Sequence, residues 1–202
     1  MVHAIKVHET GGPEVMRWEE IEVGDPGAGE ARIRHTAIGL NYIDTYFRSG
    51  LYPAPNGLPL IPGNEGAGVV VSVGEGVNDL KPGDRIAYAG PLGSYAEERV
   101  MPADRLVKIP DGVDDKTAAA MMLKGMTARY LLRRTYKVTA ETTFLFHAAA
   151  GGVGLIAGQW ARKLGATAIG TAGSAEKVKL ALENGYSHVI NYREENFAER
   201  VR

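Results

Sequence analysis

The chain has 202 residues, of which 45% are hydrophobic, and 23 Lys and Arg residues against 24 Asp and Glu residues leave a formal net charge of -1. This length and apolar content suit one large domain or two small ones with a real core, and they exclude a disordered chain. The near-zero charge argues against broad electrostatic attraction to nucleic acid or to an anionic membrane surface. Because the sequence has no Cys, it also excludes disulfides, a thiolate nucleophile and any cysteine zinc site.

The sequence also shows no spacing of histidines that suits a metal site and no targeting signal. The five histidines show no HxH, HxxxH or HExxH spacing that would place two of them on one face of a helix or strand, so we predict no metal site. The N-terminus lacks the basic region and apolar core of a secretory signal, and no run of about 18 apolar residues occurs. We therefore expect a cytoplasmic protein that binds neither nucleic acid nor membrane.

Residues 1 to about 110 are interrupted repeatedly by Gly and Pro, with short strand-like runs between these breaks. Short strands at close spacing with turn residues between them favour a compact barrel or sandwich. We predict a β-rich first part with strands at 4–7, 31–37, 68–73, 85–89 and 95–101.

From residue 115 the pattern changes to strong helix formers, which predict a helical connector. Beyond it, strand and helix patterns alternate, and this order is typical of parallel strands joined by right-handed crossovers. The fold class is therefore α/β. We predict strands at 142–147, 166–171 and 188–191, and helices at 153–164 and 175–183.

A glycine cluster, Ala-Ala-Ala-Gly-Gly-Val-Gly at 148–154, leads from the first of these strands into a helix. A dinucleotide-binding unit holds its pyrophosphate at this point, because the helix N-terminus offers free backbone N–H groups. Gly151 and Gly154 fill the second and third positions of the GxGxxG pattern, and Ala149 replaces the first. The alternative is a glycine-rich turn that only lets the helix pack close to the sheet.

The end of the second strand bears on the choice of cofactor. NAD-specific units tend to carry an acidic residue there, whereas this chain has small residues up to Ser174, followed by Lys177. Lys177 could meet a 2′-phosphate, and Tyr192 and Arg193 could add a stacking face and a second cation. This pattern favours NADPH, although Lys177 could equally be a solvated lysine and Glu176 lies beside it.

Five motifs carry a resemblance to the zinc-free NADPH:quinone oxidoreductases related to zeta-crystallin, which are medium-chain dehydrogenases/reductases. The motifs begin at Gly39, Pro62, Lys81, Leu123 and Ala148, and they follow the family's order over essentially the whole chain. In the zinc-dependent relatives the first motif carries a Cys ligand and the second a His, where this chain has Asn41 and Asn64. The resemblance thus implies metal-free chemistry without zinc.

The resemblance implies a GroES-like β-rich catalytic domain at 1–125, followed at 126–202 by the N-terminal half of a Rossmann NADPH-binding domain, with substrate and nicotinamide meeting in the cleft. The implied catalytic residues are Asn41, Tyr46, Tyr52 and Lys124. The implied cofactor-binding residues are Asn41, Thr127, Tyr130, Gly151, Gly152, Val153, Gly173, Ser174, Lys177 and Tyr192. Taken alone, the two tyrosines could be ordinary half-buried aromatics, Asn41 could cap a turn, and Lys124 could be a surface helix residue.

The implied activity is metal-free hydride transfer from NADPH to a small-molecule quinone. Two alternatives remain open: an NADPH-dependent alkenal or enone reductase, and a non-catalytic, crystallin-like NADPH-binding protein. The family also implies a homodimer for the full-length protein.

The sequence after Gly154 is long enough for only one three-stranded half of a doubly wound sheet and the start of another helix. We therefore expect a chain truncated at the C-terminus, a fragment rather than an unusually short variant. A missing second half puts the activity of these 202 residues alone in doubt.

Overall fold

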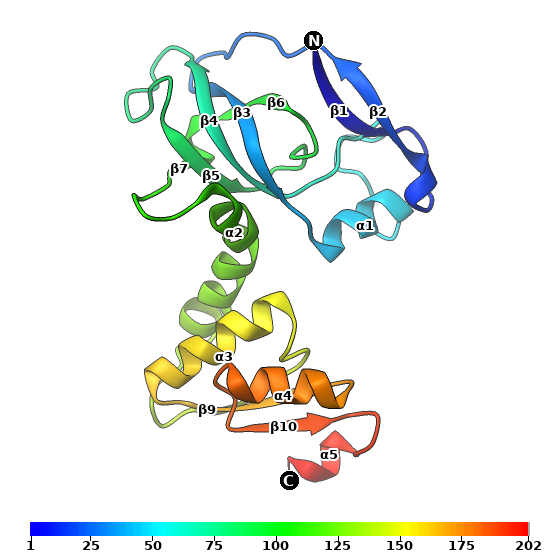
Figure 1. Cartoon of the computed structure of the whole chain (residues 1–202), viewed down its shortest axis with the longest axis vertical. Coiled ribbons are helices and arrows are strands. Elements are labelled where there is room, and N and C mark those ends of the chain that lie inside the picture. Colours follow the sequence, from blue (N-terminus) through cyan, green and yellow to red (C-terminus); the bar gives the residue numbers. More distant parts are fainter. Residues whose placement is uncertain (202) are drawn as a thin grey trace. The chain divides into compact units, whose positions relative to one another are not determined.

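The structure is a computed structural model that describes residues 1–201, and it divides the chain into two compact units. Unit 1 is Met1–Leu123 and unit 2 is Lys124–Arg202. Figure 1 shows that unit 1 consists mostly of strands and that unit 2 alternates helices with strands. Each unit therefore has the kind of secondary structure that its sequence predicts.

Unit 1 contains two sheets. β1 (Val2–Val7) pairs antiparallel with β2 (Met16–Ile21), and the bridges Ala4↔Ala96 and Val7↔Leu60 link β1 to later segments. The larger sheet is antiparallel, with the order β6-β3-β4-β5-β7. Its strands are β3 (Glu30–Gly39), β4 (Glu65–Val73), β5 (Arg85–Ala89), β6 (Glu98–Pro102) and β7 (Val107–Lys108), with short 3₁₀ turns at Pro13–Val15 and Ala103–Arg105.

All five predicted strands of this part are confirmed, 85–89 with the same ends and the other four with shifted ends, whereas the sequence analysis missed β2, β7 and one helix. That helix, α1, spans Tyr42–Ser49. Its first turn is closed by the carboxyl of Asp44, which accepts the N–H of Asn41 at 3.0 Å, and its C-cap is Gly50 with a left-handed φ of 80°. Tyr, Ile, Thr and Phe in so short a segment resemble a strand, and therefore only the caps could have revealed the helix.

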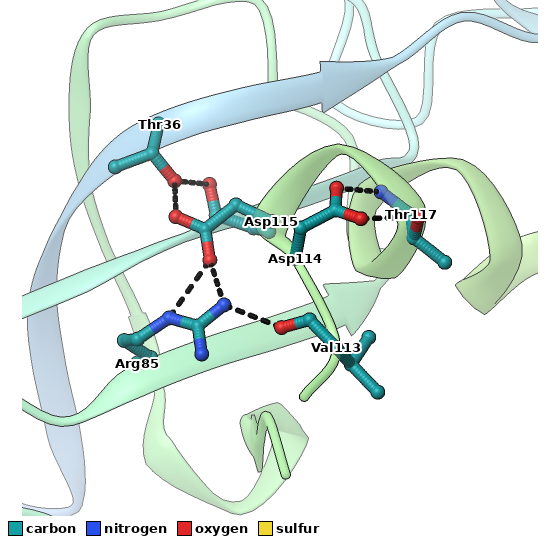
Figure 2. A network of polar contacts seen from close by, with 7 residues as sticks. Thr36, Arg85, Val113, Asp114, Asp115 and Thr117 are labelled. Atoms are coloured by element: carbon teal, nitrogen blue, oxygen red, sulfur yellow. Dashed lines mark hydrogen bonds and ion pairs between the residues drawn. The ribbon is translucent and has the colours of Figure 1, made fainter. Parts of the chain in front are cut away.

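A polar network fixes the start of α2 (Asp115–Tyr130) on the large sheet (Figure 2). The guanidinium of Arg85 on β5 and the hydroxyl of Thr36 on β3 both donate to the Asp115 carboxyl, and the Thr36 and Arg85 hydrogen bonds lower its pKa. Asp114 caps the helix by accepting the N–H of Thr117 at 2.9 Å. α2 ends in a π-helical turn, Leu131–Thr135.

Unit 2 has a parallel three-stranded sheet with the order β10-β9-β8. The predicted alternation of strands and helices is confirmed, with ends that differ by at most two residues. The elements are β8 (Thr143–Phe146), α3 (Gly152–Leu164), β9 (Thr167–Ala172), α4 (Ala175–Glu183), β10 (His188–Asn191) and α5 (Phe197–Arg200).

Small residues let α3 lie close to the turn after β8 and to the loop before β10. A Cβ added at Gly154 would lie 2.4 Å from the carbonyl oxygen of Ala148, and one added at Gly158 would lie 2.5 Å from the Tyr186 ring. The Tyr186 hydroxyl donates to the carbonyl of Gly154 at 2.9 Å. Close packing thus positions the start of α3 directly after β8. Among residues 1–201, no helix is long and apolar enough to cross a membrane.

Candidate nucleotide and acceptor sites

The glycine cluster forms the turn between β8 and α3, at the carboxyl end of the parallel strand β8. Its N-cap, Gly151, is extended, with φ −81° and ψ 170°, and has no side chain that could cap the helix. The N–H of Leu155 bonds to the carbonyl of Gly151 at 2.9 Å. The amides of Gly152, Val153 and Gly154 therefore lie in the first turn, where a helix leaves its N–H groups without intrahelical acceptors. Such a turn can bind a diphosphate.

The alanine in the first glycine position is accommodated from the neighbouring strand. Ala149 is fully buried, and a Cβ on Gly170 of β9 would lie 2.5 Å from its methyl carbon. Gly170 thus makes the room that the usual glycine would make. Ala148, one residue earlier, has φ 54°, the left-handed region that non-glycine residues rarely adopt.

Lys124, at the first position of unit 2, lies beside this turn. A Cβ on Gly152 would approach the Lys124 Cδ to 2.7 Å, so the lysine stem packs against the glycine backbone. A side chain at residue 152 would displace that stem. Thr127 and Tyr130 follow Lys124 on α2, where Thr127 is half-buried and Tyr130 is 49% exposed.

The four residues expected around the adenosine phosphate follow β9 and β10. The Tyr192 hydroxyl occupies the space beside Gly173, 2.4 Å from where a Cβ would be. Ser174 caps α4 by accepting the N–H of Lys177 at 3.4 Å, and its hydroxyl lowers the pKa of the Glu176 carboxyl. Lys177 is exposed. The turn after β9 thus carries the ammonium group of Lys177, the hydroxyl of Ser174 and the carboxyl of Glu176, whose negative charge opposes that of the lysine.

In unit 1 the structure brings Tyr46 and Tyr52 together. Their rings meet edge to face with centroids 5.4 Å apart, and the N–H of Tyr52 donates to the carbonyl of Tyr46 at 3.1 Å. Asn41 begins the helix that carries Tyr46. The three acceptor-side candidates therefore share one helix and the loop that follows it.

Two buried carboxyls that the sequence analysis missed hold this helix in place. Asp44, 3% exposed, accepts from Asn64 Nδ2 at 2.6 Å and from the Tyr95 hydroxyl at 3.0 Å, besides the N–H of Asn41. Glu65, with no exposed surface, accepts from Asn41 Nδ2 at 2.7 Å and from the N–H of Leu123 at 2.7 Å. An acidic residue inside the otherwise apolar β4 segment was the available signal.

The same network explains the chemistry of the two asparagines. Asn41 and Asn64, which stand where the zinc-dependent relatives are expected to have Cys and His, each donate an amide hydrogen to a buried carboxyl. Among residues 1–201, no cluster of three or more His, Cys, Asp or Glu could hold a metal ion. An amide is a far poorer zinc ligand than a thiolate or an imidazole. In this chain the two positions serve hydrogen bonding.

Comparison with known proteins assigns both units. Residues 27–111 match the alcohol dehydrogenase GroES-like domain, and residues 152–202 match the zinc-binding dehydrogenase domain. The chain is 54% identical over 202 residues to a quinone oxidoreductase of Pseudomonas aeruginosa and 49% identical over 207 residues to a 2-haloacrylate reductase of a Burkholderia species. In both cases the match covers 100% of this chain and 62% of the relative.

A solved structure agrees with these matches. The crystal structure of Escherichia coli quinone oxidoreductase complexed with NADPH superposes with a TM-score of 0.94 at 50% identity, covering 98% of this chain and 61% of that one. The GroES-like domain followed by a parallel-sheet nucleotide-binding part defines a medium-chain dehydrogenase/reductase. Within that class, the chain belongs to the quinone oxidoreductase family, and the resemblance found in the motifs is confirmed.

Proposed function

We propose that the chain is part of an NADPH:quinone oxidoreductase that passes a hydride to a quinone without a metal. In this proposal, residues 1–125 act as the catalytic domain and residues 126–202 bind the nucleotide. The observation that carries the proposal is the turn at 151–154, which presents first-turn amides directly after a parallel strand. The chain spans 62% of the length of its quinone oxidoreductase relative, and thus the activity is proposed for the whole protein.

The residues of unit 2 suit a dinucleotide with a 2′-phosphate. The amides of Gly152 and Val153 would donate to the pyrophosphate, with Gly151 allowing close approach. Ser174 and Lys177 would bind the additional phosphate, with Gly173 and Tyr192 forming the adjoining wall. Lys124, Thr127 and Tyr130 would lie toward the nicotinamide. NADPH, when bound, supplies the hydride.

The residues of unit 1 suit a flat acceptor. Tyr46 and Tyr52 would contact the ring and donate from a hydroxyl to the oxygen that gains negative charge. Asn41 has one amide hydrogen committed to Glu65, which leaves the second for an acceptor oxygen. These groups act by alignment and hydrogen bonding, so removing either tyrosine hydroxyl should slow turnover only modestly.

The relationship to a 2-haloacrylate reductase at 49% identity supports a second candidate, an NADPH-dependent reductase of electron-poor alkenes such as alkenals or enones. Both candidates need an acceptor that becomes an oxyanion on hydride transfer. They differ in the compound that oxidises the bound cofactor.

The deciding experiment titrates the chain with NADPH and NADH by calorimetry, and then follows the loss of reduced-cofactor absorbance with a naphthoquinone or an enone. The same measurement on a longer version of the protein tests whether activity needs more chain. Binding of NADPH without oxidation by either acceptor would support a non-catalytic, crystallin-like protein. Absence of NADPH binding in the longer version as well would refute the redox proposal.

We also propose a cytoplasmic, homodimeric full-length protein acting on a small molecule. Sedimentation of that protein at micromolar concentration tests the dimer, and a single monomeric species would contradict it.

A further inference from the structure

A cavity in unit 1 has a volume of about 680 Å³, within the range typical of small-molecule sites. Its apolar wall comes from β2, α1 and two loops, and includes Ile21, Phe47, Pro59, Leu60, Ile61 and Leu92. None of the residues proposed above as catalytic or cofactor-binding lines it. The cavity therefore has no role in the function proposed so far.

Most polar side chains in the wall are already engaged within the protein. Asn64 donates to Asp44 at 2.6 Å, and Glu98 accepts from Arg32 at 2.7 Å. The guanidinium of Arg99 donates to the carbonyls of Pro91 and Leu92 at 3.1 and 3.0 Å. Asn56 and Glu22 are solvent-exposed and keep their water. A ligand that needed hydrogen bonds would find few unused partners here, and so the wall selects an apolar one.

The cavity adjoins the tyrosine pair through one shared aromatic residue. Phe47, which lines the cavity, packs edge to face against Tyr52 with centroids 5.8 Å apart, and Tyr52 packs in the same way against Tyr46 at 5.4 Å. The loop after Tyr52 continues along the cavity at Ala54 and Pro55. A molecule with its ring at the tyrosines can therefore extend a substituent along Phe47.

We propose that this cavity binds the apolar side chain of an alkyl-substituted quinone, an inference that rests on the proposed function. The substrate class becomes quinones with an aliphatic tail, whose ring contacts Tyr46 and Tyr52 while the tail lies against Phe47, Leu60 and Leu92. Each methylene moved from water into the cavity should tighten binding by up to about four-fold.

The test compares methyl-p-benzoquinone with decyl-p-benzoquinone by calorimetric titration of the 202-residue chain. The chain has no Cys, and therefore thiol adducts with the quinones cannot form. We expect the decyl compound to bind at least about ten-fold more tightly, and decanol to compete with it but not with the methyl compound. Equal affinities for the two quinones would overturn the inference while leaving quinone binding itself intact.

Substitutions in the cavity wall test where the alkyl tail of the quinone binds. Ala54→Trp fills the cavity and Leu92→Gln makes its wall polar, and each should reduce the decyl preference to about two-fold or less. Ala28→Trp is the matched control, because Ala28 is exposed and does not line the cavity. Circular dichroism and thermal melting check that each variant folds. If both cavity variants fold and still prefer decyl-p-benzoquinone over methyl-p-benzoquinone as strongly as the unchanged chain does, the tail binds elsewhere.

The measurements distinguish failure of the proposed function from failure of the inference about the cavity. If methyl-p-benzoquinone does not bind and NADPH is not oxidised by it even in the longer protein, quinone reduction is wrong, and the tail proposal falls with it. If methyl-p-benzoquinone is reduced but the length of the quinone's alkyl substituent has no effect on affinity, only the cavity inference is wrong.

Discussion

At the level of single residues, Lys177 makes the sharpest prediction about the cofactor. It is an exposed cation in the first turn of α4, beside Ser174 and Glu176. If it binds the 2′-phosphate, Lys177→Ala should weaken NADPH about ten-fold and NADH by less than about two-fold, since only NADPH carries that charge. Calorimetry with both cofactors measures this ratio. Lys179→Ala, which removes an exposed lysine from the same helix, is the control, and equal losses for both cofactors would refute the phosphate role.

Ala148 makes a prediction about stability. Its φ of 54° places Cβ too close to the backbone, a strain of about 1–2 kcal/mol that glycine does not have. Because glycine also gains freedom in the unfolded chain, Ala148→Gly should raise the free energy of unfolding of unit 2 by up to about 1 kcal/mol.

Urea unfolding in a Trp18→Phe background measures this effect, because Trp160 on α3 then reports unit 2. Ala140 does not share the positive φ, so Ala140→Gly should lower stability instead. Stabilisation by both glycines, or by neither, would contradict the strain argument.

Residue patterns could predict the nucleotide turn but not the contacts that support it. The glycines at 151 and 154 mark the turn because close approach to a helix start requires small residues there. The pairing of Asn41 with Glu65 and of Asn64 with Asp44 joins residues more than 19 positions apart, which no local pattern reveals. Their burial only becomes visible once the strands are placed.

At the level of elements, the buried carboxyl of Asp44 connects α1 to the loop around Tyr95. Burial, and then the Asp44 carboxyl, raise the pKa of the Tyr95 hydroxyl, so it stays protonated and donates to Asp44 at 3.0 Å. Tyr95→Phe removes one of three donors to a buried carboxyl and should lower the stability of unit 1 by about 1–2 kcal/mol.

Urea unfolding in a Trp160→Phe background measures this loss, since Trp18 lies in unit 1. Tyr136→Phe is the control, because that side chain is 62% exposed. If the two variants are equally stable, the Tyr95 hydroxyl contributes nothing to the network.

Elements in which apolar residues recur at a regular spacing were predictable from the sequence, and short elements were not. The strands and helices of unit 2 repeat apolar residues at regular intervals, and their order alone implies a parallel sheet. α1 has eight residues with strand-like composition, and β7 has two. Their formation depends on tertiary contacts, such as the hydrogen bonds to Asp44, rather than on local propensity.

At the level of the whole molecule, pH links the core of unit 1 to its stability. His35 lies between the carbonyl of Ala96 and the Tyr88 hydroxyl, each 2.6 Å from a ring nitrogen. Burial lowers the pKa of His35 from 6.5 to about 4, and the nearby Arg99 charge adds to this effect. The imidazole is therefore neutral in the folded chain at neutral pH, and the unfolded chain takes up the proton first as the pH falls.

The sign of the effect follows from proton uptake. Between pH 6.5 and about 4 the unfolded state binds more protons at His35, so stability should fall with falling pH by at most roughly 3 kcal/mol. Asp84 contributes little in this window, because hydrogen bonds from Lys108 and Lys81 lower its pKa to about 2 and its unfolded value is 3.8, so most of its effect lies below pH 4. Urea midpoints of unit 1, measured across this range in the Trp160→Phe background, should therefore decline. His35→Gln should flatten that decline, whereas His188→Gln, which changes an exposed histidine of unit 2, should not. A decline equally steep without His35 would assign the acid sensitivity to other groups.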